Sequence, residues 1–249
     1  MPRIILSDPQ IKQNLITIRD EKAAYIAVVM RCLPGDLLDI RDGNGNSYRA
    51  RILSSDRKKV DAEILEKGSC NTESFLNIRL FQGLLKGEKM DLVIQKTVEL
   101  GVKEIIPVIT ERSQVRETRK LLRWQKIAEE ASRQSGRSVI PVIHGATAFD
   151  RIFTAVPAHQ RKGIVFWEIG GEQLHRVFET MKDSIDIDIL TGPEGGLSEN
   201  EVHSSVNNGF VAATLGKRIL RAETAAISAV SLVQYALGDL GTLTARSSL

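Results

Sequence analysis

Hydrophobic and polar positions alternate with a period of two at 60–64, as expected for a strand with one buried face, and the residues before them are also typical of strands. The pattern predicts strands at 37–41, 48–53 and 60–64. Turn signals at 42–46, rich in Gly and Asn, and at 54–58 join these strands. A short helix is predicted at 23–31 and stops near Pro34-Gly35. Strands joined by tight turns favour a small barrel or a curled sheet.

The pattern changes after residues 68–74, a small and polar segment that we interpret as a linker between two domains. Beyond it, apolar residues recur at helical spacing in 90–98 and 121–131, and Gly101 is placed to end the first helix. Apolar runs predict strands at 77–85, 105–109, 163–167, 185–190 and 210–213. Strands that alternate with helices favour an α/β fold with a parallel sheet covered on both faces.

The composition of the 249-residue chain is that of a globular protein, with 42% hydrophobic and 26% charged residues. No apolar run reaches the roughly 20 residues that a membrane helix needs, and the N-terminus lacks the apolar region of a signal peptide. We therefore expect a cytoplasmic protein without a membrane anchor. Cys32 and Cys70 are interpreted as free buried thiols, and no Cys/His spacing indicates a metal site.

The net charge of +3 is small, but basic residues are concentrated in two segments. The first contains Arg112, Arg116, Arg119, Lys120, Arg123, Lys126, Arg133 and Arg137. The second contains Lys217, Arg218 and Arg221. Such clusters can bind the phosphates of a nucleic acid even when the net charge is low. Glutamates between residues 111 and 130 partly neutralise the first cluster, so a solvated helix face is an equally good interpretation.

A glycine-rich loop follows the strand predicted at 185–190. Its sequence is Thr191-Gly192-Pro193-Glu194-Gly195-Gly196-Leu197. In open α/β sheets, ligands bind beyond the C-terminal ends of the strands, and glycines let the backbone approach a ligand closely. Ser198 and Glu201 then form a capping box, which predicts a helix starting at Glu199. An ordinary glycine turn before a capped helix would have the same sequence, so the loop alone does not define a site.

A second loop, residues 215–221, follows the strand predicted at 210–213 and opens the last long helix. Ile219 and Leu220 form an apolar pair among charged residues, which suits a flat adenine ring. Alternatively, the pair fills the core beneath a basic loop. The chain contains no G-x-x-x-x-G-K-[ST] segment and no G-x-G-x-x-G after the strand at 77–85. Neither a P-loop nor a dinucleotide site is therefore predicted.

These two loops resemble those of the RsmE-type RNA uridine-N3 methyltransferases of the SPOUT superfamily. The matching segments are Gly192-Pro193-Glu194-Gly195-Gly196-Leu197-Ser198 and Leu215-Gly216-Lys217-Arg218-Ile219-Leu220-Arg221-Ala222-Glu223-Thr224-Ala225. Further matches, in order, are Lys86-Gly87-Glu88-Lys89-Met90, Ile94-Gln95-Lys96, Glu99-Leu100-Gly101, Glu111-Arg112-Ser113, Trp124-Gln125-Lys126-Ile127-Ala128 and Gln134-Ser135-Gly136-Arg137. The resemblance covers nearly the whole chain, including Pro2-Arg3 and the Asp42-Gly43 turn. The segment 167–171 matches less clearly.

The resemblance implies an RNA-binding, PUA-like β-barrel at 1–72, a trefoil-knotted α/β methyltransferase domain at 73–243, and a flexible tail at 244–249. It also implies a homodimer, S-adenosylmethionine as the cofactor, no metal, and a uridine of small-subunit (16S) ribosomal RNA as the substrate. The cofactor residues expected on this basis are Trp167, Leu190, Thr191, Gly192, Pro193, Glu194, Gly195, Gly196, Leu215, Gly216, Ile219 and Leu220. The expected RNA-binding residues are Arg3, Arg116, Arg123, Lys126, Arg133 and Gln134.

Methylation of uracil at N3 requires loss of the N3 proton, and a nearby cation favours the resulting anion. Arg221 is the first candidate for this catalytic role, with Arg112 and Arg137 as rivals. Alternatively, Arg221 pairs with Glu223 and only holds the loop. Glu194 is a poor general base, because the start of the following helix favours its ionised form, and we expect it to shape the loop. Two other functions stay open, namely a SPOUT methyltransferase acting on another RNA position or a ribose hydroxyl, and a non-catalytic RNA-binding assembly protein.

Overall fold

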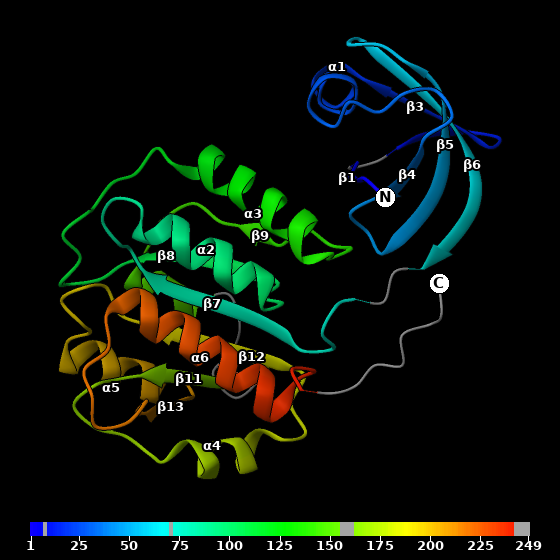
Figure 1. Ribbon diagram of the computed structural model, residues 1–249. Helices are drawn as coiled ribbons and strands as arrows, with labels where there is room; N and C mark the ends of the chain where they lie inside the picture. The colour runs from blue at the N-terminus through cyan, green and yellow to red at the C-terminus, as the bar shows by residue number, and fades with distance from the viewer. Residues whose placement is uncertain (7–8, 70–71, 155–161, 242–249) are drawn as a thin grey trace. The chain divides into compact units, whose positions relative to one another are not determined.

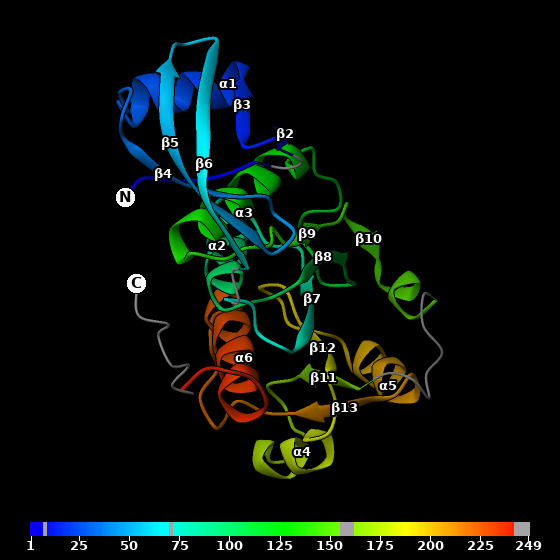
Figure 2. The same ribbon diagram turned by 90° about the vertical axis from the view of Figure 1, so that its right-hand side faces the viewer.

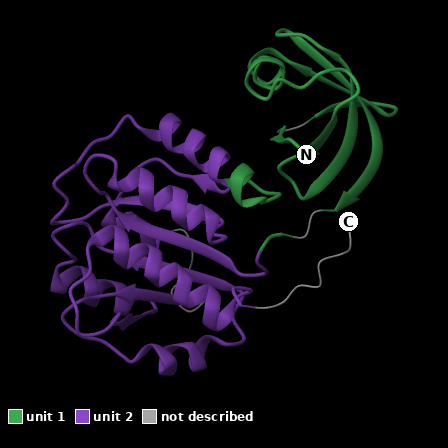
Figure 3. Cartoon of the chain, viewed as in Figure 1, with its two compact units in different colours: residues 1–73, 132–140 green, residues 74–131, 141–249 purple. Residues whose placement is uncertain are grey.

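The computed structural model describes residues 1–6, 9–69, 72–154 and 162–241 (Figure 1). Cys70 and the predicted tail at 244–249 lie outside these residues. The chain divides into two compact units, one of residues 1–73 and 132–140 and one of residues 74–131 and 141–249 (Figure 3). The sequence contained no sign that 132–140 belongs with the N-terminal residues. The predicted domain boundaries themselves stay predictions.

The first unit is built around a six-stranded sheet in the order β1-β4-β5-β6-β3-β2. Its strands are β1 (Arg3–Ile5), β2 (Gln10–Lys12), β3 (Leu15–Arg19), β4 (Leu37–Arg41), β5 (Asn46–Ser55) and β6 (Lys59–Ser69). Strands β1 and β4 are parallel, and the other pairs are antiparallel. The predicted helix is present as α1 (Asp20–Ala24), continued by the π-helix η1 (Tyr25–Val29). The alternating positions Val60, Ala62 and Ile64 lie in the core of this unit, as predicted, and Ile16 and Ile18 join them from strand β3, which was not predicted.

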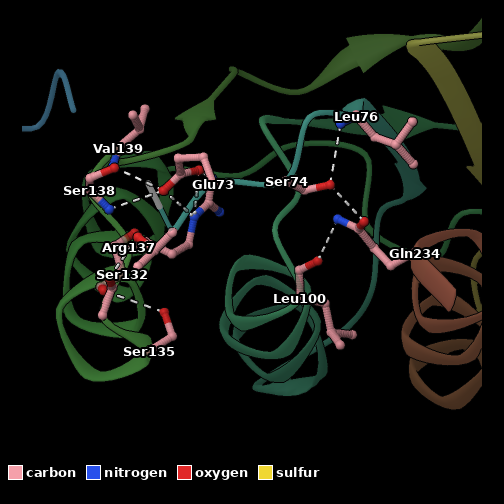
Figure 4. Close-up of polar contacts among 12 residues, drawn as sticks. Glu73, Ser74, Leu76, Leu100, Ser132, Ser135, Arg137, Ser138, Val139 and Gln234 are labelled. Carbon is pink, nitrogen blue, oxygen red and sulfur yellow. Dashed lines mark hydrogen bonds and ion pairs between the residues drawn. The ribbon is translucent and has the colours of Figure 1, made fainter. Parts of the chain in front are cut away.

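The return segment 132–140 is tied to Glu73 within the first unit. Arg137 is only 3% exposed, and its guanidinium lies 2.6 Å from the Glu73 carboxylate. The backbone N–H groups of Ser138 and Val139 donate to the same carboxylate at 3.0 and 3.2 Å (Figure 4). A buried ion pair of this kind is stable only when further hydrogen bonds satisfy the charged groups, as they do here.

The second unit contains a seven-stranded sheet in which every strand pair is parallel, as the sequence predicted. The order is β10-β8-β7-β12-β11-β13, and β9 pairs with β8. The strands are β7 (Asn77–Gly83), β8 (Glu104–Ile109), β9 (Val142–Ile143), β10 (Thr147–Ala148), β11 (Gly163–Phe166), β12 (Asp186–Thr191) and β13 (Phe210–Ala213). The helices are α2 (Lys89–Glu99), α3 (Leu121–Ser135), η2 (Phe149–Phe153), α4 (Leu174–Met181), α5 (Glu199–Asn207) and α6 (Ala222–Leu237), and the residues of α3 from Ser132 onwards belong to the first unit. The short strands β9 and β10 were not predicted.

Successive residues of the central strands face opposite sides of this sheet. Ile189 packs in the core with residues of α2, α3, α4 and α6, whereas Leu190 packs with residues of α5 and η2. Figures 1 and 2 show α5 on the side of the sheet opposite α2 and α6. Near the C-terminal end of α6, Gln234 accepts a hydrogen bond from Ser74 and donates to Leu100 O, both at 2.9 Å (Figure 4).

No helix among the described residues is long and apolar enough to cross a membrane.

Candidate active site

A pocket of about 370 Å³ opens at the C-terminal ends of β11, β12 and β13. Strand β11 pairs with both neighbours, and Phe166 at its end is the partner of Thr191 and of Ala213. The loops after the three strands therefore start at the same level. They supply most of the lining, with Trp167, Glu168, Thr191, Gly192, Pro193, Glu194, Gly195, Gly196, Thr214, Leu215, Gly216, Arg218, Ile219, Leu220, Arg221 and Glu223 among its residues. Pockets of roughly 300–1,000 Å³ are typical of small-molecule sites.

The glycine loop is a tight turn that leaves little room for side chains. A Cβ on Gly192 would lie 3.0 Å from the carbonyl carbon of Gly196, and Gly196 itself has φ +71°. The N–H of Gly196 donates to Pro193 O at 2.9 Å and closes the turn. The predicted capping box of Ser198 and Glu201 is confirmed, and α5 begins at Glu199.

Gln82 and Gly83, which the sequence did not indicate, hold the glycine loop against strand β7. Gln82 is fully buried, and its Nε2 donates to Gly192 O at 3.1 Å. A Cβ on Gly83 would lie only 2.3 Å from Pro193 N, so the two backbones are in close contact. A polar side chain at the end of an apolar strand was the available signal for Gln82, since buried polar groups require partners.

Glu194 links the glycine loop to the loop after β7. Its Oε1 accepts hydrogen bonds from Lys86 N at 3.2 Å and from Lys89 Nζ at 3.1 Å. Burial alone would raise the pKa of the Glu194 carboxyl, but its hydrogen bonds with backbone N–H groups and Lys89 outweigh that effect and lower the pKa. The ionised form is therefore favoured, as the sequence predicted. The interactions that favour it include long-range partners that the sequence did not identify.

The second loop presents Ile219 and Arg221 to the pocket. Ile219 is 85% exposed, so the interpretation that it fills the core is wrong. Arg221 is the N-cap residue of α6 and lines the pocket, as does Glu223. Among the described residues Arg221 makes no ion pair, with Glu223 or otherwise. Trp167 Nε1 and Glu223 Oε2 are buried without a hydrogen-bond partner in the same described set, which marks them as groups that a ligand could satisfy.

Three of the residues predicted for catalysis or cofactor binding are not lining residues of this pocket. Leu190 is fully buried in the core on the α5 side of the sheet. Arg137 is buried and paired with Glu73 in the first unit. Arg112 is exposed beside the glycine loop, where its Nη1 donates to Gly195 O at 3.2 Å. Of the two rivals to Arg221, only Arg112 is thus in contact with a lining residue of the pocket.

The residues predicted to bind RNA are divided between the units. Arg3, Arg133 and Gln134 belong to the first unit, and Arg116, Arg123 and Lys126 belong to the second. Arg3 pairs with Asp39 at 2.6 Å, and the Arg133 guanidinium lies 4.7 Å from the centre of the Tyr25 ring. Arg123 pairs with Asp91 at 2.8 Å, whereas Lys126 is exposed on α3. Their role in RNA binding stays a prediction.

A parallel sheet with a pocket at the C-terminal ends of its strands is typical of α/β proteins that bind a small molecule there. A family model described as an RNA methyltransferase domain matches residues 72–234, and one described as an RNA methyltransferase PUA domain matches residues 18–65. The chain is 32% identical to ribosomal RNA small subunit methyltransferase E of Buchnera aphidicola over 96% of this chain and 95% of the relative.

Two solved structures are similar over almost their full length. One is ribosomal RNA small subunit methyltransferase E from Neisseria gonorrhoeae bound to S-adenosylmethionine, with 34% identity, a TM-score of 0.87, and coverage of 96% of this chain and 99% of that one. The other is a methyltransferase from Legionella pneumophila in complex with the same cofactor, with 32% identity, a TM-score of 0.85, and coverage of 95% and 98%. The chain belongs to the ribosomal RNA small subunit methyltransferase E family.

Proposed function

We propose that this protein transfers the methyl group of S-adenosylmethionine to N3 of a uridine in 16S ribosomal RNA. The observation that carries the proposal is the pocket that the glycine loop and Arg221 line together. The relatives are named for methylation of small-subunit ribosomal RNA, and two neighbouring structures hold S-adenosylmethionine. The uridine and its N3 atom rest on the family resemblance and on the chemistry of the arginine.

The residues of the pocket fit a nucleoside cofactor. Close backbone approach is available along Gly192 to Gly196, and the exposed Ile219 offers an apolar surface for a flat ring. The buried polar atoms of Trp167 and Glu223 are the groups to pair with polar or cationic atoms of the cofactor. When bound, S-adenosylmethionine supplies an electrophilic methyl group.

Arg221 has the charge and the position to favour the reactive form of the base. Its guanidinium is a cation, and a cation stabilises a uracil that has lost its N3 proton. Glu194, ionised and hydrogen-bonded to Lys89, shapes the loop rather than removing that proton. Alignment of the base with the cofactor in the pocket supplies the rest of the rate enhancement.

The trefoil knot, the homodimer and the cytoplasmic location also belong to this proposal. Helix α6 carries the exposed side chains of Leu232 and Tyr235, which supports an interface between two copies of the chain. Light scattering on the purified protein tests the dimer, and a monomer at micromolar concentration would exclude it. A cytoplasmic location follows from ribosomal RNA as the substrate.

The decisive experiment incubates the purified protein with S-adenosylmethionine and small ribosomal subunits that lack the modification. Nuclease digestion and mass spectrometry then identify the methylated nucleoside and its position. N3-methyluridine in the 16S RNA is the expected product. Detection of a 2′-O-methylated nucleoside would show that the enzyme methylates a ribose hydroxyl and not a base. Binding of RNA and cofactor without any methylated product would indicate an assembly protein.

A further inference from the structure

Glu201 makes a contact that its capping role does not require. It lies in the first turn of α5, is 7% exposed, and accepts a hydrogen bond from Ser198 N through Oε2 at 2.9 Å. Its other oxygen, Oε1, accepts from Glu111 N at 2.8 Å. Glu111 lies in the loop after β8, ninety residues earlier in the chain. One buried carboxylate therefore joins the start of α5 to a separate loop of the same unit.

The loop that Glu201 holds carries Arg112. It is a compact turn, in which Thr110 N donates to Ser113 Oγ at 3.0 Å and Ser113 N donates to Thr110 O at 3.1 Å. Arg112 lies against the glycine loop, because a Cβ on Gly195 would be 3.0 Å from Arg112 Cβ. Its Nη1 also donates to Gly195 O. The Glu111 backbone, fixed by Glu201, thus determines where the Arg112 guanidinium meets the edge of the pocket.

Both oxygens of Glu201 are used by backbone N–H groups, and only a carboxylate serves both. The two oxygens of a carboxylate can each accept one hydrogen bond from a backbone N–H group, as they do here. A glutamine has one acceptor oxygen, and its amide NH₂ would face the second N–H group. A capping box by itself needs one oxygen only. The second contact is therefore the one that requires glutamate.

We propose that Glu201 is a positioning residue for methyl transfer, which holds Arg112 at the edge of the pocket for contact with the RNA substrate. The inference rests on the proposed function, because Arg112 acts on RNA only if RNA enters this pocket. Glu201 is not among the lining residues of the pocket. Glu201 acts through its hydrogen bond with Glu111 N on the position of Arg112. A change at Glu201 should therefore alter the methylation of RNA and not the affinity for S-adenosylmethionine.

The test compares Glu201→Gln with Ser198→Ala in single-turnover methylation of small subunits. Ser198→Ala removes the other half of the capping box but leaves the contact to Glu111, so it controls for lost helix stability. We expect Glu201→Gln to slow methylation about 10- to 100-fold, the range for a catalytic group displaced by about an ångström. Its affinity for S-adenosylmethionine, measured by calorimetry, should equal that of the wild type. Ser198→Ala should retain the wild-type rate.

An Arg112→Ala background separates positioning from general damage. If Glu201 acts through Arg112, Glu201→Gln should slow the Arg112→Ala enzyme no further. Glu201→Asp is the second variant if the glutamine variant does not fold, because it keeps a carboxyl group and the hydrogen bond from the backbone N–H of residue 201 to Ser198 Oγ, while its shorter side chain moves the carboxyl group away from Glu111 N. A wild-type rate in the glutamine or aspartate variant, or additive losses, would overturn the inference. Absence of methylation by the wild type would instead contradict the proposed function.

Discussion

Thr191 Oγ1 donates a hydrogen bond of 2.9 Å to Gln82 Oε1 where the parallel strands β12 and β7 end. Both residues are buried, and Gln82 also donates to Gly192 O, so strand β7 anchors the first turn of the glycine loop. The loop thus keeps its shape through a polar network inside the protein. Such networks are rigid when all their members are satisfied.

We expect Gln82→Leu to destabilise the protein by about 1–3 kcal/mol, because it leaves Gly192 O without its buried donor. The affinity for S-adenosylmethionine should fall as the loop loses its anchor. Urea denaturation and calorimetry measure the two effects. Thr191→Val, which leaves the hydrogen bond to Gly192 in place, is the matched control and should reduce affinity less. Equal affinities in wild type and Gln82→Leu would show that the loop needs no anchor.

Gly195→Val should abolish binding of S-adenosylmethionine and leave the protein folded. The added side chain would displace Arg112, whose Cβ lies 3.0 Å from the position of a Cβ on Gly195, and would occupy the pocket edge. Calorimetry measures binding, and circular dichroism checks the fold. Gly145→Val is the control, because among the described residues, its two chain neighbours aside, no atom lies within 4 Å of its added Cβ. Unchanged affinity in a folded Gly195→Val protein would place the cofactor elsewhere.

Arg221→Ala should slow methyl transfer roughly 10²–10³-fold, as does the loss of a group that stabilises an anion in a transition state. Cofactor and RNA affinities should change little, because the effect belongs to the transition state. Single-turnover rates at saturating cofactor and RNA measure it. Lys217→Ala, an exposed neighbour that does not line the pocket, serves as the control. A near wild-type rate for Arg221→Ala would eliminate its catalytic role.

The pKa of Glu194 predicts a pH-dependent contribution to stability. Because the folded-state pKa lies below its ordinary value of 4.5, the ionised form favours folding. That contribution is complete above the ordinary value and is lost as the pH falls through the lower, folded-state value. Glu194→Gln should cost about 1 kcal/mol at neutral pH, because the pair with Lys89 is partly exposed.

Denaturation of wild type and Glu194→Gln across the acidic range checks this prediction. The difference between their free energies of unfolding should shrink as the pH falls below the ordinary value of 4.5. Glu179→Gln, an exposed position on α4, is the control for removal of a surface charge. A difference that stays constant with pH would mean that ionisation of Glu194 does not stabilise the fold.

Lys126→Glu should weaken RNA binding and flatten its salt dependence, reducing the slope by about 1 for one lost phosphate contact. Lys126 is exposed on α3 and suits this test better than Arg123, whose pairing with Asp91 would confound charge reversal with lost stability. Affinity measured over a range of salt concentrations gives the slope. Lys182→Glu, exposed at the end of α4, is the control. An unaltered slope for Lys126→Glu would identify this face of α3 as merely solvated.

Features encoded by neighbouring residues could be predicted from the sequence. Period-two alternation predicted part of strand β6 in the first unit, apolar runs predicted the central strands of the second unit, and the spacing of Ser198 and Glu201 predicted the first residue of α5. The glycine loop and the second loop were recognised from motifs only a few residues long. Turns, caps and amphipathic faces depend on contacts within a few positions of the chain, so their signals survive in a linear sequence.

The partners of those loops were decided only by the tertiary structure. Gln82 lies 110 residues from Gly192, Glu201 lies 90 residues from Glu111, and the buried pair of Arg137 and Glu73 spans 64 residues. No local sequence pattern specifies which two buried polar groups form a hydrogen bond or an ion pair with each other. The parallel pairing of β7 with β12 brings Gln82 to the glycine loop, and the return of residues 132–140 brings Arg137 to Glu73. Burial then makes these contacts obligatory, because a charged or polar group without a partner is costly once removed from water.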